Sequence, residues 1–418
     1  MNEISGFNLA VRHHPALVAE AETAEDVAEA LAYAVSRDLP VAVQATGHGA
    51  VQAADGAVLI LTSRMRSLEI DPVERTATIG AGCTWAEVVR AAAPFGLAPL
   101  CGSASGVGAV GFTLGGGVGP LARTYGFAAD HVRALTVVTP DGVTRVADPG
   151  GEADLFWALR GGKGGFGVVT SITVDLFPLA TVWGGGFYYA AADAPAVLRA
   201  YREWAPTLPE TVTTSIALVR LPPLPQLPPP LSGQFVAHLR VASVEPQEAL
   251  LAPMLGVAEP VLGGVGELPY TQLDLIHNDP TDPMPAVERS TLLRDLTPEA
   301  VETLLSVAGP SVELPIPVVE IRHLGGALAR EPKEPNAVGG REAAFNLLVV
   351  GLPGSAPEAI TGALAPWSTG GTLINFHGSD LTTLDRAWPA ATRARLAEIR
   401  NRVDPRDLFR LGHVAPRS

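Results

Sequence analysis

GVGAVGFTLGGGVGPLARTYGFAAD, residues 106–130, is the most unusual stretch of this sequence. Its first six residues match G-x-G-x-x-G, which alone is a weak indication of a nicotinamide dinucleotide site. Such a site needs a strand before the motif and a helix directly after it, whereas here Pro99–Gly102 precedes the motif and Leu114–Gly119 (LGGGVG) continues it. Each glycine inside a helix costs roughly 1 kcal/mol. The stretch therefore predicts an extended loop whose backbone N–H groups face an anionic ligand.

Two further glycine-rich segments accompany this loop. Thr46–Gly49 (TGHG) follows an expected buried strand at Pro40–Ala45, and Phe156–Gly167 (FWALRGGKGGFG) contains Arg160 and Lys163, which add positive charge. Glycines allow a ligand to approach the backbone closely. Together the segments predict that a large dinucleotide lies along the chain. The alternative is that they form three unrelated tight turns.

The remaining pattern indicates an α+β protein. Thr23 can cap a helix over Thr23–Arg37, and Thr84 can cap a second helix. Residues 181–350 alternate strand-like runs with helical patches, which is an α+β pattern. A late strand is expected around Leu373–Phe376, and a polar helix is expected from Leu384 to Val403. Further strands of the N-terminal half are expected at Val58–Thr62, Thr76–Gly80, Leu135–Pro140, Val143–Val146 and Val168–Leu176.

Composition excludes several classes of protein. The 418 residues carry a net charge of -14, so nucleic acid is not an expected partner. Two cysteines, Cys83 and Cys101, offer neither a disulfide framework nor a zinc site, and no metal is expected. The sequence lacks both a signal-peptide pattern and an apolar run of about 18 residues, which predicts a cytoplasmic protein without membrane contact.

Four stretches, in this order and spacing, resemble the FAD-linked oxidase superfamily, specifically its berberine-bridge-enzyme-like branch. They are PVAVQATGHG at Pro40–Gly49, the stretch at Gly106–Asp130, DLFWALRGGKGGFGVVTS at Asp154–Ser171, and VDPRDLFRLGHVAP at Val403–Pro416. The resemblance covers nearly the whole chain. It implies that FAD is the cofactor.

In this family a histidine of the first stretch bonds to the flavin ring, and His48 occupies that position. Many relatives have a second tether, a cysteine, where this chain has Ala104; Cys101 lies three residues earlier. The resemblance therefore implies a single covalent bond, through His48, with Cys101 as a small buried residue. Val107 matches a position near the flavin at which small side chains accompany oxidases, which implies a path for oxygen.

The resemblance also implies a wider set of cofactor-binding residues, drawn from all three glycine-rich segments. These residues are Thr46, Gly47, His48, Gly49, Ala104, Ser105, Val107, Gly108, Gly111, Leu114, Gly115, Gly117, Gly161, Gly162, Gly167 and Val168.

The usual acid–base residues of the family are missing. Relatives often have a tyrosine where this chain has Leu373, and a Glu or Gln on an earlier strand where only Asn346 is available. If residues 373–377 are extended, Asn375 and His377 share the face of Leu373. His377 is then the first candidate for a base, because its reference pKa of ~6.5 suits a base near neutral pH.

Other polar residues receive weaker assignments. His413 and His323 are further candidates for the base, although a hydrogen-bonded strand histidine is an equally good interpretation of His323, and a mechanism without a protein base is also open. Glu320 and Arg322 are expected to form a structural ion pair. The histidines without a motif are expected to be structural: His13, His14, His131, His238 and His277.

The expected fold has two lobes. Residues 1–180 form a PCMH-type FAD-binding domain of two α/β subdomains, residues 181–375 form a substrate domain with an antiparallel sheet and helices, and residues 376–418 return to the FAD domain. The implied activity is two-electron oxidation of a small apolar or aromatic molecule, such as a secondary metabolite, with reoxidation by molecular oxygen. The alternatives are a flavin-containing cyclase without net redox turnover and a non-catalytic binding protein.

Overall fold

The computed structural model describes residues 3–417. Helix α1 (Ala24–Arg37) begins at Thr23, whose hydroxyl accepts a hydrogen bond from the Asp26 N–H, while the Asp26 carboxylate accepts one from the Thr23 N–H. This reciprocal cap satisfies N–H groups that have no partner within the helix. The buried face of α1 packs on a parallel sheet with strand order β3-β5-β4 (β3 Leu17–Glu20, β4 Val41–Gln44, β5 Val58–Leu61).

An antiparallel five-stranded sheet completes the N-terminal lobe, with strand order β6-β7-β10-β8-β9. Its strands are β6 (Leu68–Asp71), β7 (Thr76–Gly80), β8 (Val132–Val138), β9 (Thr144–Ala147) and β10 (Val168–Asp175). Helix α2 (Trp85–Ala92) follows Thr84, as predicted, and β8 and β9 form the predicted hairpin. A short ribbon of β1 (Ile4–Ser5) and β2 (Arg12–His13) stands apart from both sheets. The lobe therefore combines helices with one parallel and one antiparallel sheet.

Two details of the glycine-rich segments differ from prediction. Helix α3 (Ala109–Leu114) begins directly after Gly108, where an extended loop was expected. The segment 109–114 contains a single glycine, and Ala109, Val110 and Thr113 are buried, so packing stabilises a short helix there. Phe156 belongs to α5 (Ala153–Ala158) rather than to a turn. The run Gly115–Gly119 is non-helical, as predicted, and is followed by α4 (Ala122–Tyr125).

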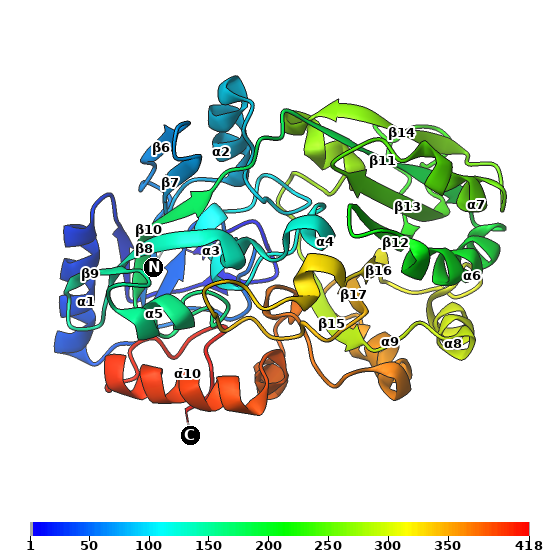
Figure 1. Ribbon diagram of the computed structural model, residues 1–418. Coiled ribbons are helices and arrows are strands. Elements are labelled where there is room, and N and C mark those ends of the chain that lie inside the picture. The colour runs from blue at the N-terminus through cyan, green and yellow to red at the C-terminus, as the bar shows by residue number, and fades with distance from the viewer. Residues whose placement is uncertain (1–2, 418) are drawn as a thin grey trace.

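The second lobe is built on a seven-stranded antiparallel sheet with strand order β14-β11-β13-β12-β16-β17-β15 (Figure 1). Apolar residues alternate along its strands, and one face packs against helices in a core that includes Ile216, Leu239, Ile321 and Leu347. The strands are β11 (Thr181–Ala190), β12 (Val212–Arg220), β13 (Phe235–Ser243), β14 (Leu262–Pro269), β15 (Val287–Leu293), β16 (Val318–His323) and β17 (Phe345–Gly351). The helices are α6 (Ala194–Trp204), α7 (Ala252–Leu255), α8 (Pro298–Ala308) and α9 (Pro357–Ala363).

The opposite face of this sheet is turned toward the N-terminal lobe. Arg322 on β16 donates a hydrogen bond to the Val118 carbonyl, and Thr213 on β12 accepts one from the Arg123 N–H. These contacts place the sheet over the glycine-rich segments, with α4 between the lobes (Figure 1).

The last part of the chain lies against the N-terminal lobe (Figure 1). The Val41 N–H donates to the Leu408 carbonyl, and the Gly164 N–H donates to the His413 carbonyl. Helix α10 (Ala390–Val403) packs on α5. The predicted helix from Leu384 to Val403 is divided, because a 3-10 segment (Leu381–Ala387) ends before Pro389 and α10 begins after it.

The predicted late strand at 373–376 is wrong. Residues Ile374–Phe376 form a 3-10 turn instead, so the alternation that placed Asn375 and His377 on one face does not apply. The other 3-10 segments are Ala93–Phe95, Ala128–His131, Ala205–Thr207, Glu248–Leu251, Tyr270–Ile276, Gly326–Ala329 and Ala365–Trp367.

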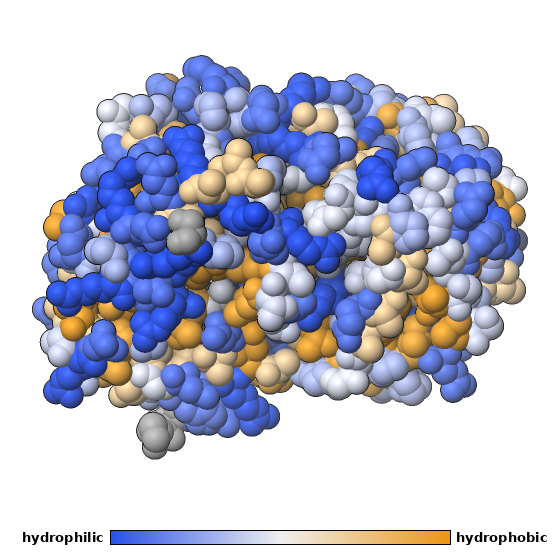
Figure 2. Space-filling model, turned by 90° about the horizontal axis from the view of Figure 1, so that it is seen from below, coloured by the Kyte–Doolittle hydropathy of each residue, from blue (hydrophilic) through white to orange (hydrophobic). Residues whose placement is uncertain are grey.

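Seen from below, the surface is largely hydrophilic, with apolar residues in separate patches (Figure 2). Among residues 3–417, no helix is long and apolar enough to cross a membrane. No cluster of three or more His, Cys, Asp or Glu side chains in the same range could hold a metal ion.

Candidate functional site

His48 lies in a turn directly after β4. Its Nδ1 is hydrogen-bonded to the Thr46 hydroxyl at 2.8 Å, and its ring stacks on Phe7 with 3.8 Å between ring centroids. Burial lowers the pKa of His48 to about 4, so the imidazole is neutral at physiological pH. Gly47 has a φ of 76° and packs against Gly6, so a larger residue would fit neither the backbone nor the space. The turn therefore holds a neutral histidine in a fixed orientation.

Two of the predicted cofactor-binding glycines, Gly49 and Gly111, face open space, as does Gly106, which was not in the predicted set. A side chain added at Gly49, Gly106 or Gly111 would meet no atom within 4 Å. A Cβ added at Gly108 would lie 3.5 Å from the Thr46 hydroxyl oxygen, so the segment at Gly106–Asp130 adjoins the Thr46–Gly49 turn. Because these three bare positions leave room at the backbone, this part of the lobe fits a ligand such as FAD, whose phosphates bind backbone N–H groups.

The remaining predicted glycines pack against protein. A side chain at Gly115 would overlap Asn375, one at Gly117 would crowd Phe112, and one at Gly161 would overlap the Val338 backbone. Gly162 and Gly167 are likewise closed by the carbonyls of Ala158 and Val138, and Val168 and Leu114 pack in the hydrophobic core. These glycines allow close packing within the protein, and little of their backbone faces open space.

Ala104 lies in a segment that the second lobe fixes. Ser103 donates to the Asp279 carboxylate at 2.6 Å, and Ser105 donates its N–H and its hydroxyl to Asp274 at 3.0 and 2.5 Å. Cys101 is buried, with its sulfur 3.7 Å from the Tyr270 hydroxyl, and burial raises the pKa of its thiol to about 12. This cysteine is therefore a neutral thiol in the core rather than a nucleophile.

The two cations of the third glycine-rich segment have different surroundings. Lys163 donates from Nζ to the Gly111 carbonyl at 2.7 Å and to the Asn375 Oδ1 at 2.9 Å, and burial lowers its pKa to about 8. Arg160 instead donates to the carbonyls of Glu334 and Pro335. Only Lys163 therefore adjoins the open backbone at Gly111.

His377 and His413 come together, with 5.7 Å between ring centroids. His377 Nε2 bonds to the Asp380 carbonyl at 2.8 Å and His413 Nε2 bonds to the Gly378 carbonyl at 2.7 Å. Because a carbonyl can only accept, Nε2 carries the proton in each ring, and Nδ1 is the atom that can accept one. Burial lowers the pKa of both histidines, that of His413 to about 3.

Asn375 and His323 have structural partners. Asn375 Nδ2 donates to the Phe112 carbonyl at 2.9 Å, which joins its turn to the end of α3. His323 Nε2 is 3.0 Å from Arg123 Nη1, and its ring stacks on Phe345, on the helix-covered face of the sheet. The position of His323 matches the interpretation of a hydrogen-bonded strand histidine, whose partner Arg123 lies in α4.

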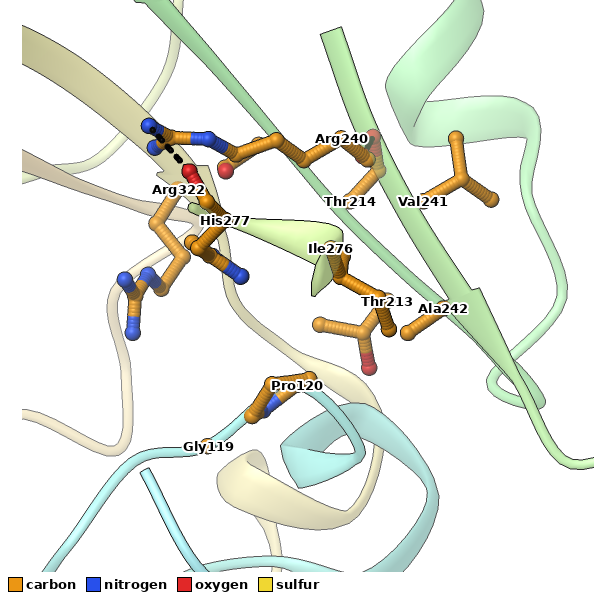
Figure 3. A pocket seen from close by; sticks show the side chains of 11 residues that line it. Gly119, Pro120, Thr213, Thr214, Arg240, Val241, Ala242, Ile276, His277 and Arg322 are labelled. Carbon is orange, nitrogen blue, oxygen red and sulfur yellow. Dashed lines mark hydrogen bonds between the residues drawn. The ribbon is translucent and has the colours of Figure 1, made fainter. Parts of the chain in front are cut away.

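The face of the sheet that meets the N-terminal lobe carries polar residues that sequence reasoning set aside. Arg240, Glu320 and Arg322 form a buried ion cluster with Arg240–Glu320 at 2.9 Å and Arg322–Glu320 at 3.1 Å. Figure 3 shows Arg240 and Arg322 together with His277. The predicted Glu320–Arg322 pair is therefore present within a larger group. Buried polar atoms without a hydrogen-bond partner lie on the same face: Ser215 Oγ, His238 Nε2 and both amide atoms of Asn346. His277 Nδ1, at the end of the 3-10 segment beside this face, also has no partner.

These unpartnered atoms are the feature that a sequence pattern could not reveal. His238 and His277 were expected to be structural, and the pocket was expected to be apolar. The alternation of β13 nevertheless places His238 beside Arg240, where its Nδ1 accepts a bond from Arg240 Nε at 3.1 Å. Buried polar groups without partners are rare in folded proteins, so these atoms call for a bound water, ion or ligand as a partner.

Glu288 is a further acidic candidate that the sequence did not single out. It lies at the start of β15, and its strand position shares the face of Ser290, whose hydroxyl bonds to Thr372 at 2.5 Å. Burial, with the nearby Asp279 carboxylate, raises the pKa of Glu288 to about 7. A carboxyl of this kind can exchange a proton near neutral pH. The Glu288 carbonyl also packs against Gly378, next to His377.

Comparison with known proteins identifies the class. Residues 15–148 match the family model of an FAD-binding domain. An FAD-linked oxidoreductase of Dictyostelium discoideum is 27% identical over 333 residues, which are 78% of this chain and 71% of that protein. The chain is therefore an FAD-dependent oxidoreductase.

Two solved structures share the whole fold. BBE-like 1 of Physcomitrella patens superposes with a TM-score of 0.86 at 18% identity, over 99% of this chain and 94% of that one. Glucooligosaccharide oxidase of Acremonium strictum, described with a 6-S-cysteinyl, 8α-N1-histidyl FAD, gives a TM-score of 0.81 at 22% identity over 98% and 94%. Together with the matched FAD-binding domain, these comparisons show that the chain has the fold of the berberine-bridge-enzyme-like and FAD-linked oxidase structures.

Proposed function

We propose that this protein is an oxidase that binds FAD covalently through His48 and oxidises a small organic molecule held between the glycine-rich segments and the polar face of the seven-stranded sheet. The observation that carries the proposal is that the sheet face with unpartnered polar atoms is turned toward the N-terminal lobe, as the hydrogen bond from Arg322 to the Val118 carbonyl shows. That lobe has open backbone at Gly49, Gly106 and Gly111. FAD, when bound, supplies the acceptor for two electrons from the substrate.

The proposed cofactor surface consists of the His48 turn, the segment from Ala104 to Gly111, and Lys163. His48 supplies a neutral imidazole nitrogen, which is the form that can act as a nucleophile. Ser105 and Val107 are held in place by the second lobe and by α2, since the Val107 carbonyl accepts from the Trp85 N–H at 3.0 Å. The buried Cys101 thiol supports a single tether.

The proposed substrate is an aromatic or polyketide-like molecule that also carries hydrogen-bonding groups. Ile276 and Ala242 contribute apolar surface to the cavity beneath the sheet, while Ser215, His277 and Arg322 contribute polar atoms. A substrate of this type forms hydrogen bonds with the buried polar atoms that have no partner in the protein. Without such bonds, each of these buried atoms costs free energy.

Glu288 and His377 are the proposed proton acceptors, with His413 behind them and Asn375 positioning the turn that carries His377. Oxidation of a C–H or O–H group by hydride transfer releases a proton, which some group must accept. Glu288 suits this role because its pKa near 7 makes it partly ionised at neutral pH. His377 offers Nδ1, as its Nε2 is already bonded to a carbonyl.

Molecular oxygen is the proposed second substrate, since Val107 leaves a small side chain at the position implied to lie beside the flavin. The experiment that tests the proposal exposes the holoenzyme to a panel of phenolic, enolic and heteroaromatic compounds while hydrogen peroxide is measured. One peroxide per oxidised molecule supports the oxidase. Product formation without peroxide favours a cyclase, and binding without any product favours a binding protein; either result contradicts the proposal.

A further inference from the structure

A small cavity lies between the sheet and the Gly119–Pro120 segment of the N-terminal lobe (Figure 3). Its walls come from β12, β13 and β16 and from the end of the 3-10 segment Tyr270–Ile276. Arg240, His277 and Arg322 lie around it in the close-up. Four of the lining residues are used below, namely Ser215, Arg240, His277 and Arg322. With Glu320, which pairs with both arginines, they form what we call the cationic cluster.

The cationic cluster carries an excess of one positive charge. Two guanidinium groups, which stay protonated, surround a single carboxylate, that of Glu320. Although burial opposes ionisation, Arg322 and Arg240 hold the pKa of Glu320 well below its usual range, so the carboxylate is charged. Burial and Arg240 lower the pKa of His277, which is therefore neutral near pH 7.

All five side chains are at least nine-tenths buried, with Arg240 6% and Arg322 5% exposed. A buried charge that is not compensated is costly, so an opposite charge is expected to complete the group. The Asp279 carboxylate acts on His277 from outside the cavity, where it accepts a hydrogen bond from Ser103.

The cluster also has unused hydrogen-bonding capacity. Ser215 Oγ and His277 Nδ1 have no partner. Arg322 Nη1 reaches only the Val118 carbonyl, at 3.4 Å, and Arg240 Nη2 reaches only the His277 carbonyl, at 3.5 Å. A guanidinium has five N–H donors in a fork that matches a planar anion. The unused N–H donors and the excess positive charge both favour an anionic ligand.

We propose that the cationic cluster binds a single negative charge on the substrate, namely a carboxylate, enolate or phenolate. This inference rests on the proposed oxidase function and names the substrate class for it. The cavity has room for about one water-sized group, so only a charged oxygen of the anion enters it while the rest of the molecule lies outside. Arg322 also lies over the Phe376 ring at 5.4 Å, next to Asn375, so the anion is held beside the glycine-rich segments.

The test compares benzoate with benzamide, a neutral compound of nearly the same shape, as ligands of the holoenzyme. Affinity is measured by calorimetry and by the shift in melting temperature. Benzoate is expected to bind at least about tenfold more tightly than benzamide. Equal affinities, or tighter binding of benzamide, would overturn the proposal.

Two variants with opposite changes of charge separate anion binding from structural support. Arg322→Gln removes the excess charge and should weaken benzoate binding by about tenfold or more, whereas Glu320→Gln raises the excess charge and should strengthen it. Arg199→Gln is the matched control, because Arg199 pairs with Glu302 on the exposed side of α6 and is not in the cavity. Weaker binding in both Arg322→Gln and Glu320→Gln would mean that the cluster is only structural.

The anion site and the proposed oxidase function can fail independently, and the experiments distinguish the two failures. If a variant does not fold, the comparison of benzoate with benzamide on the unaltered protein still decides the question. Peroxide production from neutral substrates, together with equal binding of the two probes, would leave the oxidase standing and remove the anion site. Selective benzoate binding without any peroxide production would support the anion site and contradict the oxidase function.

Discussion

His48 joins local backbone geometry to the covalent chemistry of the protein. The glycine before it allows the tight turn, and burial keeps the imidazole neutral. We predict that intact mass under denaturing conditions shows one FAD added to the protein, and that His48→Ala releases FAD on unfolding. His14→Ala, a change at an exposed histidine, should retain the added mass. Dissociation of FAD from the unaltered protein in acid, or a crosslink at Cys101, would contradict the single tether.

The identity of the base can be determined from the pH dependence of flavin reduction under anaerobic conditions. A carboxylate accepts a proton only when it is ionised, so a base with the pKa of Glu288, about 7, gives a rate that rises as pH increases through 7. His377 has a lowered pKa, so its rise lies below pH 6.5.

The substitution that removes the base should eliminate the corresponding limb of the pH profile. It should also slow flavin reduction by ~10²-fold or more. Glu288→Gln and His377→Ala are compared under the same conditions, and each serves as the control for the other. A profile that neither substitution alters would remove both residues from the mechanism and leave the proton to water.

Val107 offers a test of oxygen access. The backbone hydrogen bonds of Val107 to Trp85 and Ala104 fix where its side chain lies. Val107→Leu adds one methylene and should slow reoxidation of the reduced flavin more than reduction by substrate, as measured by stopped-flow absorbance. Val73→Leu, at a highly exposed position, is the control. Equal reoxidation rates in both variants and the unaltered protein would exclude a gate at this residue.

At the scale of elements, the Ser105–Asp274 contact holds the segment 103–107 to the second lobe. Charge-assisted hydrogen bonds contribute about 1.5–3 kcal/mol each, and Asp274 accepts two from Ser105. Asp274→Asn should therefore increase hydrogen exchange in residues 103–107 and lower the melting temperature, whereas Asp282→Asn, at an exposed position nearby, should do neither. Unchanged exchange in this segment would show that the contact does not order it.

Elements with strong local signals were predictable, and elements fixed by packing between lobes were not. The capped helix α1 and the hairpin of β8 and β9 follow from residues within each segment. Helix α3 was missed because its stability comes from three buried side chains beneath flanking glycines. The turn at 374–376 was missed because Asn375 bonds to Phe112 and Lys163, which are more than 200 residues away in the sequence.

The candidate site also combines local features, which the sequence predicted, with long-range features, which it did not. Motif spacing located His48 and the open glycines, since these are local backbone features. The polar face is assembled from β12, β13, β16 and β17, and its register brings Ser215, Arg240, Glu320, Arg322 and Asn346 together. No single stretch of sequence contains that arrangement, so His238 and His277 carried no visible signal.

The whole molecule brings a cofactor lobe and a sheet together around a buried polar surface, and the central claim is that this assembly is an FAD oxidase. The most direct test needs no knowledge of the substrate. The bound flavin is reduced anaerobically by light, mixed with oxygenated buffer, and followed by absorbance while peroxide is measured. The account predicts reoxidation clearly faster than that of free reduced flavin, with one hydrogen peroxide per flavin. Purified protein that carries no FAD, or a bound flavin that reoxidises no faster than free flavin, would contradict it.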